Sequence, residues 1–204
     1  ETRVTLTTSV GNRGAATAIS DTANTISTSV LATNDAPTIV STVSSVAGVI
    51  ENTPATISAV FTLTDADLLR SEGTGIGQVT LTAVSGGFVL GSGSGVTITS
   101  GNQATDRGAG DWGGGSTTLV FTGNLTQLKA ALDGLQYVTG DNPATSDTIT
   151  VTFNDRNNAG VETNGGSSTH SASTTITISS ITPTNDAPVI TRPATVTTVE
   201  DTDY

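Results

Sequence analysis

The sequence lacks cysteine and methionine, and it has very little histidine, lysine or aromatic content. Without cysteine, the chain has no disulfide framework, no thiol nucleophile and no cysteine-based zinc site. A single histidine also excludes a histidine-rich metal centre. The only lysine is Lys129, and the six arginines are scattered, so no basic stripe is available to bind nucleic acid.

Long hydrophobic runs are missing as well. No apolar stretch approaches the roughly 18 residues that a membrane-spanning helix needs, so membrane insertion is not expected. The beginning of the chain has neither the charged nor the apolar region of a signal peptide. The first residue is Glu1 rather than Met, and we expect the sequence to be a segment of a longer polypeptide.

The chain is rich instead in acidic residues, threonine and glycine. Its 204 residues include 18 Asp and Glu against 7 Lys and Arg, which gives a formal net charge of -11. The acids occur singly or in small groups, and such groups suit a hard cation better than a basic partner. The 42 threonines and 23 glycines favour strands and turns over helices.

An internal repeat divides the chain. The segment 33–37 (Thr-Asn-Asp-Ala-Pro) recurs as 184–188, which is 151 residues later, and the flanking residues match on both sides. A match that extends into both flanks is stronger than a lone motif. We therefore predict three parts: the C-terminal strands of a preceding repeat in 1–33, a complete repeat in 34–184, and the start of the next repeat in 185–204.

Apolar and polar residues alternate over most of the complete repeat. This period of two surrounds Phe61, Leu81, Phe121, Val151 and Ile176, and it predicts about eight to ten short strands. We expect an all-β fold, an antiparallel β-sandwich with apolar residues facing inward and threonine facing outward. The expected large core residues are Phe61, Phe88, Phe121, Tyr137 and Phe153.

One stretch breaks the strand pattern and predicts a single short helix near 125–133. Apolar residues recur there at helical spacing. Asn124 can cap the beginning, Gln127 stands three residues later as in a capping box, and Gly134 can end the last turn.

A pair of aspartates could carry chemistry. Asp65 and Asp67 follow a predicted strand, and with one residue between them both side chains would leave the same face. Two close carboxylates repel each other, and a calcium ion relieves this because it binds 6–8 oxygen ligands. Pro37 holds Ala36 extended, which leaves the carbonyl groups of the linker available. A solvated turn without metal accounts for the spacing equally well.

The order of three motifs resembles the cadherin repeat. These are 34–37 (Asn-Asp-Ala-Pro), 49–54 (Val-Ile-Glu-Asn-Thr-Pro) and 64–67 (Thr-Asp-Ala-Asp), and their order and approximate spacing agree over 34–67. The remainder resembles the bacterial cadherin-like repeats of large secreted surface adhesins. The resemblance implies a cadherin-like, Ig-like β-sandwich, with Ca²⁺ bound at the junctions between successive repeats.

The same resemblance assigns eight possible calcium ligands to successive junctions. For the junction before the complete repeat they are Asn34, Asp35, Asp65 and Asp67. For the junction after it they are Glu51, Asn185 and Asp186, and Glu200 would belong to a further junction. The linker is shorter than the cadherin form by one asparagine and lacks its leading aspartate, which implies fewer or weaker ions. Asp147 and Asp155 are acidic residues that could supply missing charge.

Catalytic sites are not expected. His170 lies in a Gly- and Ser-rich stretch, where a solvated loop histidine is the simpler interpretation than a Ser–His–acid triad. Asp106 and Asp111 precede Trp112 and could form a glycosidase carboxylate pair beside a sugar platform. A loop anchored by one half-buried tryptophan explains that stretch more simply.

The expected function is therefore structural: a calcium-stiffened spacer repeat of a long, secreted, cell-surface adhesin. One alternative is a subunit of an extracellular filament or surface layer, and another is an accessory carbohydrate-binding domain of a polysaccharide-degrading enzyme. The expected partners are neighbouring repeats of the same chain or adjacent copies. Because 1–33 and 185–204 are part-repeats, their missing strands would come from the same chain or from a neighbouring molecule, by lateral or head-to-tail association.

Overall fold

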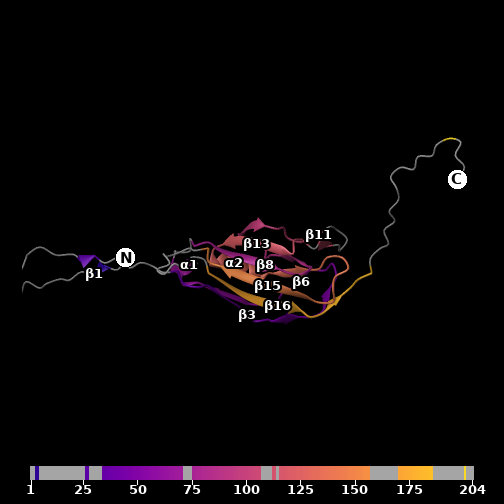
Figure 1. Cartoon of the computed structure of the whole chain (residues 1–204), viewed down its shortest axis with the longest axis horizontal. Helices are drawn as coiled ribbons and strands as arrows, with labels where there is room; N and C mark the ends of the chain where they lie inside the picture. Colours follow the sequence, from indigo (N-terminus) through magenta and orange to yellow (C-terminus); the bar gives the residue numbers. More distant parts are fainter. Residues whose placement is uncertain are drawn as a thin grey trace, which may run out of the picture.

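The computed structural model describes residues 3–4, 26–27, 34–70, 75–106, 112–113, 115–156, 170–185 and 200. Over these residues the chain is mostly β, with several antiparallel sheets and two helices, in agreement with the predicted all-β class (Figure 1). No helix in this part of the chain is long and apolar enough to cross a membrane. Of the first predicted part-repeat, the structure describes an antiparallel pair, β1 (Arg3–Val4) with β2 (Ile26–Ser27).

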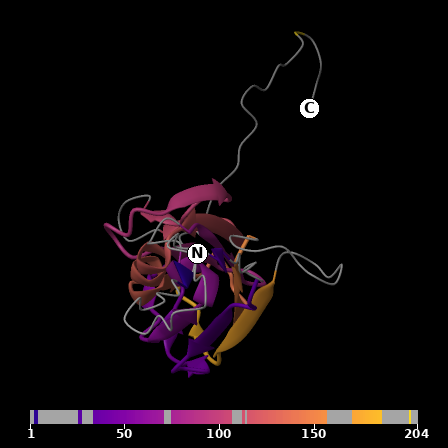
Figure 2. The same cartoon turned by 90° about the vertical axis from the view of Figure 1, so that its left-hand side faces the viewer.

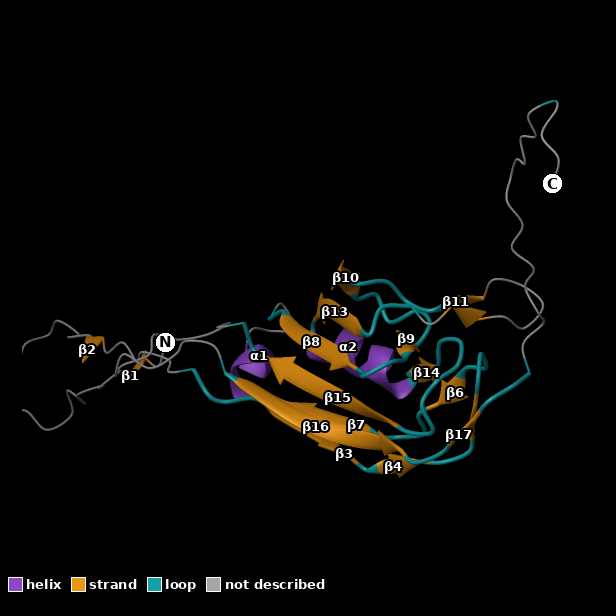
Figure 3. Ribbon diagram, turned by 45° about the vertical axis from the view of Figure 1, so that its right-hand side comes forward, coloured by secondary structure: helices purple, strands orange, loops and turns teal. Residues whose placement is uncertain are grey.

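A six-stranded sheet forms one side of the core (Figure 3). In spatial order its strands are β10 (Thr97–Ser100), β13 (Thr118–Gly123), β8 (Gly77–Thr82), β15 (Asp147–Asn154), β16 (Ser171–Ile178) and β4 (Ser45–Val46). All neighbours are antiparallel except β4, which runs parallel to β16.

Shorter pairings complete the fold between β3 and β17. They are β3 (Thr38–Ser41) with β7 (Phe61–Thr64), β6 (Ala55–Thr56) with β14 (Gln136–Val138) and β9 (Gly87–Val89), β5 (Val49–Ile50) with β17 (Ile181–Thr182), and β11 (Thr105–Asp106) with β12 (Trp112–Gly113). The β5–β17 pair is parallel, like β4–β16. The prediction of a purely antiparallel arrangement is wrong at these two pairings. Each joins an early strand to a late one, so the whole repeat serves as the long connection that parallel strands require.

The period of two places apolar residues inside and threonine outside, as predicted. Leu81 on β8 lies opposite Val151 on β15, and both side chains are fully buried. The next residue, Thr82, lies opposite Thr150 on the outer face. The edge strand β10 differs, because all four of its residues are exposed and Ile98 retains 38% of its surface.

The predicted helix is present as α2 (Leu125–Asp133). The side chain of Asn124 accepts the N–H of Gln127, and the side chain of Gln127 accepts the N–H of Asn124, so the capping box is complete. Gly134 ends the helix. The buried residues of α2 face the core, and they are Leu128, Ala131 and Leu132.

A second helix, α1 (Ala66–Arg70), was not expected, so the prediction of one short helix is wrong. It follows directly after β7, where the sequence reads Ala-Asp-Leu-Leu-Arg. Ala, Leu and Arg are good helix formers, and Asp is favourable in the first turn of a helix because of the helix dipole. The buried side chain of Leu68 holds α1 to the core.

The core joins the two sides of the repeat. All five predicted large residues are fully buried: Phe61, Phe88, Phe121, Tyr137 and Phe153. The rings of Phe88 and Tyr137 meet edge-on with centroids 6.5 Å apart. Each such buried side chain contributes about 1.5–3 kcal/mol of transfer free energy. Viewed along the long axis, α2 and β16 lie on opposite sides of this core (Figure 2).

Candidate functional site

The predicted ligands separate into two groups at opposite ends of the folded part of the chain. One group lies beside α1 and includes Asn34, Asp35, Asp65 and Asp67, whereas Glu51 lies beside β17 near Asn185 (Figure 3). Asp186 falls outside the described residues. Glu200 is described as an exposed turn residue, and the structure places it with none of the others.

Asp65 and Asp67 do not leave one face of a strand, so the geometric argument made for them is wrong. Asp65 caps α1: its Oδ1 accepts the N–H groups of Asp67 and Leu68 at 2.9 and 2.8 Å. Asp67 stands in the first turn. Both side chains are nonetheless almost completely buried, with 2% and 1% of their surface exposed.

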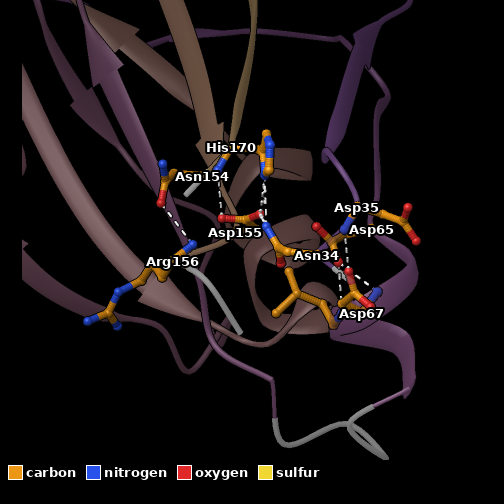
Figure 4. A network of polar contacts seen from close by, with 9 residues as sticks. Asn34, Asp35, Asp65, Asp67, Asn154, Asp155, Arg156 and His170 are labelled. Atoms are coloured by element: carbon orange, nitrogen blue, oxygen red, sulfur yellow. Dashed lines mark hydrogen bonds and ion pairs between the residues drawn. The ribbon is translucent and has the colours of Figure 1, made fainter. Parts of the chain in front are cut away.

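The linker 34–37 docks on these aspartates (Figure 4). The N–H of Asp35 donates to Oδ2 of Asp67 at 2.6 Å. The amide Nδ2 of Asn34 lies 2.6 Å from Oδ2 of Asp155 and 2.8 Å from Nδ1 of His170. The exposed side chain of Asp35 points away from the group, so this residue enters the site through its main chain.

His170 is a site residue that sequence reasoning did not place there, whereas Asp155 was expected only as a possible source of missing charge. Asp155 is fully buried at the end of β15, and His170 directly precedes β16. The N–H of His170 donates to Oδ1 of Asp155 at 3.0 Å, and the N–H of Asp155 donates to the carbonyl of His170. The interpretation of His170 as a solvated loop residue is therefore wrong. Its side chain is two-thirds covered, and its partners are Asn34 and Asp155.

The group carries buried negative charge. Burial raises the pKa of Asp65 above its usual value, and the nearby charges of Asp155 and Asp67 raise it further, against the lowering effect of the two cap hydrogen bonds. Oδ2 of Asp65 is buried and has no hydrogen-bond partner among the described residues. The guanidinium of Arg156 points away from Asp155 in Figure 4 and is exposed. A bound cation would offset the repulsion between these carboxylates and stabilise the charged form of Asp65.

The side chains alone do not complete a metal shell. Within the described part of the chain, no three Asp, Glu or His side chains are grouped so that they could hold a metal ion. A calcium ion beside Asp65 would therefore also need the amide oxygen of Asn34 and main-chain carbonyl groups, which are donors that calcium accepts. The asparagine amide can present either its oxygen or its nitrogen to the site by a rotation.

At the other end, Glu51 is 2% exposed and holds the outgoing linker. Its Oε2 accepts the N–H of Thr184 at 2.6 Å, and its Oε1 accepts the N–H of Asn142. Asn52, the next residue, donates to Oδ1 of Asp141 at 3.1 Å. Glu51 thus lies beside the second copy of the linker motif, immediately before Asn185.

Asp147 is a structural carboxylate rather than a supplier of charge to either group. Its oxygens accept the N–H groups of 84–86 and the hydroxyl of Tyr137. Burial disfavours its charged form, but the hydrogen bonds from Tyr137 and the main chain outweigh this and hold the pKa of Asp147 below its usual value. Burial, together with the bond to Asp147, raises the pKa of Tyr137 well above its usual range.

The tryptophan loop lies mostly outside the described residues, which include Asp106 and Trp112 as opposite members of the β11–β12 pair but not Asp111.

No known protein family and no curated protein matches this sequence.

Proposed function

We propose that this chain is a calcium-stiffened spacer repeat of a long extracellular surface adhesin. The observation that carries the proposal is the buried Oδ2 of Asp65, which lacks a hydrogen-bond partner among the described residues and lies in the group formed by Asp67, Asp155 and the docked linker. An unneutralised carboxylate in such a place costs several kcal/mol unless it is paired or bound to metal. Calcium suits the carboxylate groups of this site because it prefers oxygen ligands, and the amide oxygen of Asn34 could add another.

The linker connects the ion to the architecture of a tandem array. Because Asp35 is bonded through its N–H to Asp67, an ion that fixes Asp65 and Asp67 also fixes the direction in which the chain enters the repeat. The second copy of the motif begins at Thr184, which Glu51 binds at the other end of the described fold. Calcium bound at both ends would convert a chain of sandwiches into a stiff rod.

The resemblance to cadherin repeats extends this proposal to the remaining residues. Glu51, Asn185 and Asp186 would serve the outgoing junction, and Glu200 the next one along the chain. The two-sided core is compatible with a cadherin-like, Ig-like sandwich. The protein is then not an enzyme, its place is outside the cell or at the cell surface, and its partners are adjacent repeats.

A filament or surface-layer subunit is the second candidate, and one observation favours it. Strand β10 stands at the edge of the six-stranded sheet, has all four of its residues exposed, and carries no charged residue that would discourage pairing with another chain. Light scattering of the purified chain separates the candidates. A spacer stays monomeric as its concentration rises, whereas a filament subunit forms larger species.

Thermal unfolding in excess chelator and in millimolar calcium tests the proposed function. A site with a dissociation constant near 10⁻⁴ M adds about 1.4 kcal/mol per ion at 1 mM calcium. Asp65→Asn should remove most of this gain. Asp133→Asn is the matched control, because Asp133 is an exposed acid paired with Lys129 and should leave the gain unchanged. Equal unfolding temperatures in both media would contradict the proposal.

A further inference from the structure

The side chain of Glu51 continues a parallel strand pairing past the point where the main chain turns away. In the β5–β17 ladder, the N–H of Val49 donates to the carbonyl of Ser180, and the N–H of Glu51 donates to the carbonyl of Thr182. In a regular parallel ladder, the N–H of Thr184 would next donate to the main-chain carbonyl of Glu51. It donates instead to Oε2 of the Glu51 side chain, at 2.6 Å.

The local backbone explains why the side chain of Glu51, and not its main-chain carbonyl, accepts the N–H of Thr184. Asn52 has a φ of 55°, a left-handed conformation that turns the chain out of the strand direction. The main-chain carbonyl of Glu51 accepts the hydroxyl of Thr53 at 3.3 Å. A carboxylate supplies the missing acceptor for Thr184, and its second oxygen binds the N–H of Asn142 from the loop between β14 and β15. Glu51 therefore ties three segments of the chain together.

We propose that Glu51 is a positioning residue that clamps the outgoing linker independently of calcium. Charge-assisted hydrogen bonds from main-chain N–H groups neutralise this buried carboxylate without an ion. Oε2 also accepts the hydroxyl of Thr184 at 3.4 Å, whereas Oε1 accepts the N–H of Asn142 and has a second lone pair, so the clamp does not exclude calcium coordination. In this respect Glu51 differs from Asp65, whose Oδ2 has no hydrogen-bond partner among the described residues.

In a tandem array, which rests on the proposed function, every linker would be held on two sides. The preceding repeat would hold it through the carboxylate bonded to the Thr184 N–H. The following repeat would hold it through the bond that Asp67 makes with the Asp35 N–H. Chelation would then loosen the second hold and leave the first, which confines the calcium-dependent bending to the few residues after Thr184.

Amide hydrogen exchange of the 204-residue chain in excess chelator, resolved by NMR, tests the clamp. Glu51→Ala should speed exchange at Thr184 and Asn142 by about tenfold or more. Glu51→Gln keeps one acceptor oxygen and should retain part of the protection. The matched control is Asp147→Asn, which removes a buried carboxylate that binds main-chain N–H groups elsewhere. Beyond the uniform increase that its lower stability causes, this variant should speed exchange at 84–86 and not at Thr184.

Two results would overturn the clamp. One is a Thr184 amide that exchanges equally fast in the wild type and in Glu51→Ala. The other is faster exchange throughout the chain in Glu51→Ala, with Thr184 and 84–86 affected alike, because that indicates general destabilisation. Neither result bears on the calcium-dependent increase in stability that Asp65→Asn is expected to remove. The clamp and the proposed calcium site can therefore fail separately.

Discussion

The N–H of Asp35 donates to Oδ2 of Asp67 at 2.6 Å, which joins the linker to the first turn of α1 across 32 residues of sequence. Through this bond, the path of the chain into the repeat depends on the same carboxylate that stands beside the buried Asp65. Asn34 makes the second attachment, to Asp155 and His170. The linker is thus part of the packed end of the domain, a position from which an ion bound to these residues can stiffen it.

Asp65→Asn should change stability in opposite directions with and without calcium. In chelator, the variant should be at least as stable as the wild type, because it removes a buried charge while asparagine still caps α1. The folded-state pKa of Asp65 lies above its unfolded value of about 3.8, so the metal-free wild type loses stability as the pH rises above that value. Denaturant unfolding of the wild type and the variant, at pH 4 and pH 7 and with and without calcium, measures these differences in the free energy of unfolding. A variant that is equally destabilised in both media would contradict the interpretation.

Asp155→Asn tests the residue that extends the predicted ligand group. Asparagine keeps an acceptor for the N–H of His170 but removes one negative charge from the site. We expect the calcium dissociation constant to rise by about tenfold, because affinity follows the charge of the ligand set. Isothermal titration calorimetry measures the constant, with Asp133→Asn as the exposed control. Unchanged affinity would place Asp155 outside the calcium shell.

Asp147→Asn should destabilise the chain by about 2–3 kcal/mol at neutral pH, because it replaces one of the acceptors of several buried donors. The folded-state pKa of Asp147 is lowered, so its contribution exists above about pH 3.8 and is lost as the pH falls below it. The difference from the wild type should therefore shrink in acid. Unfolding in urea from pH 7 to pH 3 measures it, and a constant difference would show that the charge of Asp147 is unimportant.

Asn124→Ala should cost about 1 kcal/mol through loss of the α2 cap and leave calcium binding unchanged. Asn124→Asp is the conservative control and should retain most of the stability, since aspartate caps equally well. Chemical unfolding together with calcium titration checks both statements. An altered calcium affinity would connect α2 to the site, contrary to the arrangement described above.

The features that could be predicted from sequence are those that depend on local pattern. The helix at 125–133 follows from apolar residues at helical spacing together with Asn124, Gln127 and Gly134, and the buried aromatic residues follow from the period of two. In contrast, α1 has only five residues, and its signal was hidden by the interpretation of Asp65 and Asp67 as strand-end ligands. Its cap is recognisable afterwards from Asp65 followed by helix-forming residues.

Other parts of the site depend on contacts between distant segments. Asp155 continues the inward positions 151 and 153 of β15, a signal that could have identified it as buried. Nothing in the sequence around His170 indicates its contact with Asn34, 136 residues earlier. The same holds for Glu51 and Thr184, which are adjacent because β5 and β17 pair across the length of the repeat.

The most direct test of the calcium site is anomalous diffraction from crystals of the 204-residue chain grown in millimolar calcium. The account predicts an anomalous peak about 2.3–2.6 Å from Oδ2 of Asp65, with further ligand oxygens from Asp67 or Asp155 and from the linker. A map at saturating calcium without a peak beside Asp65, or with Oδ2 of Asp65 bonded to protein donors alone, would contradict it.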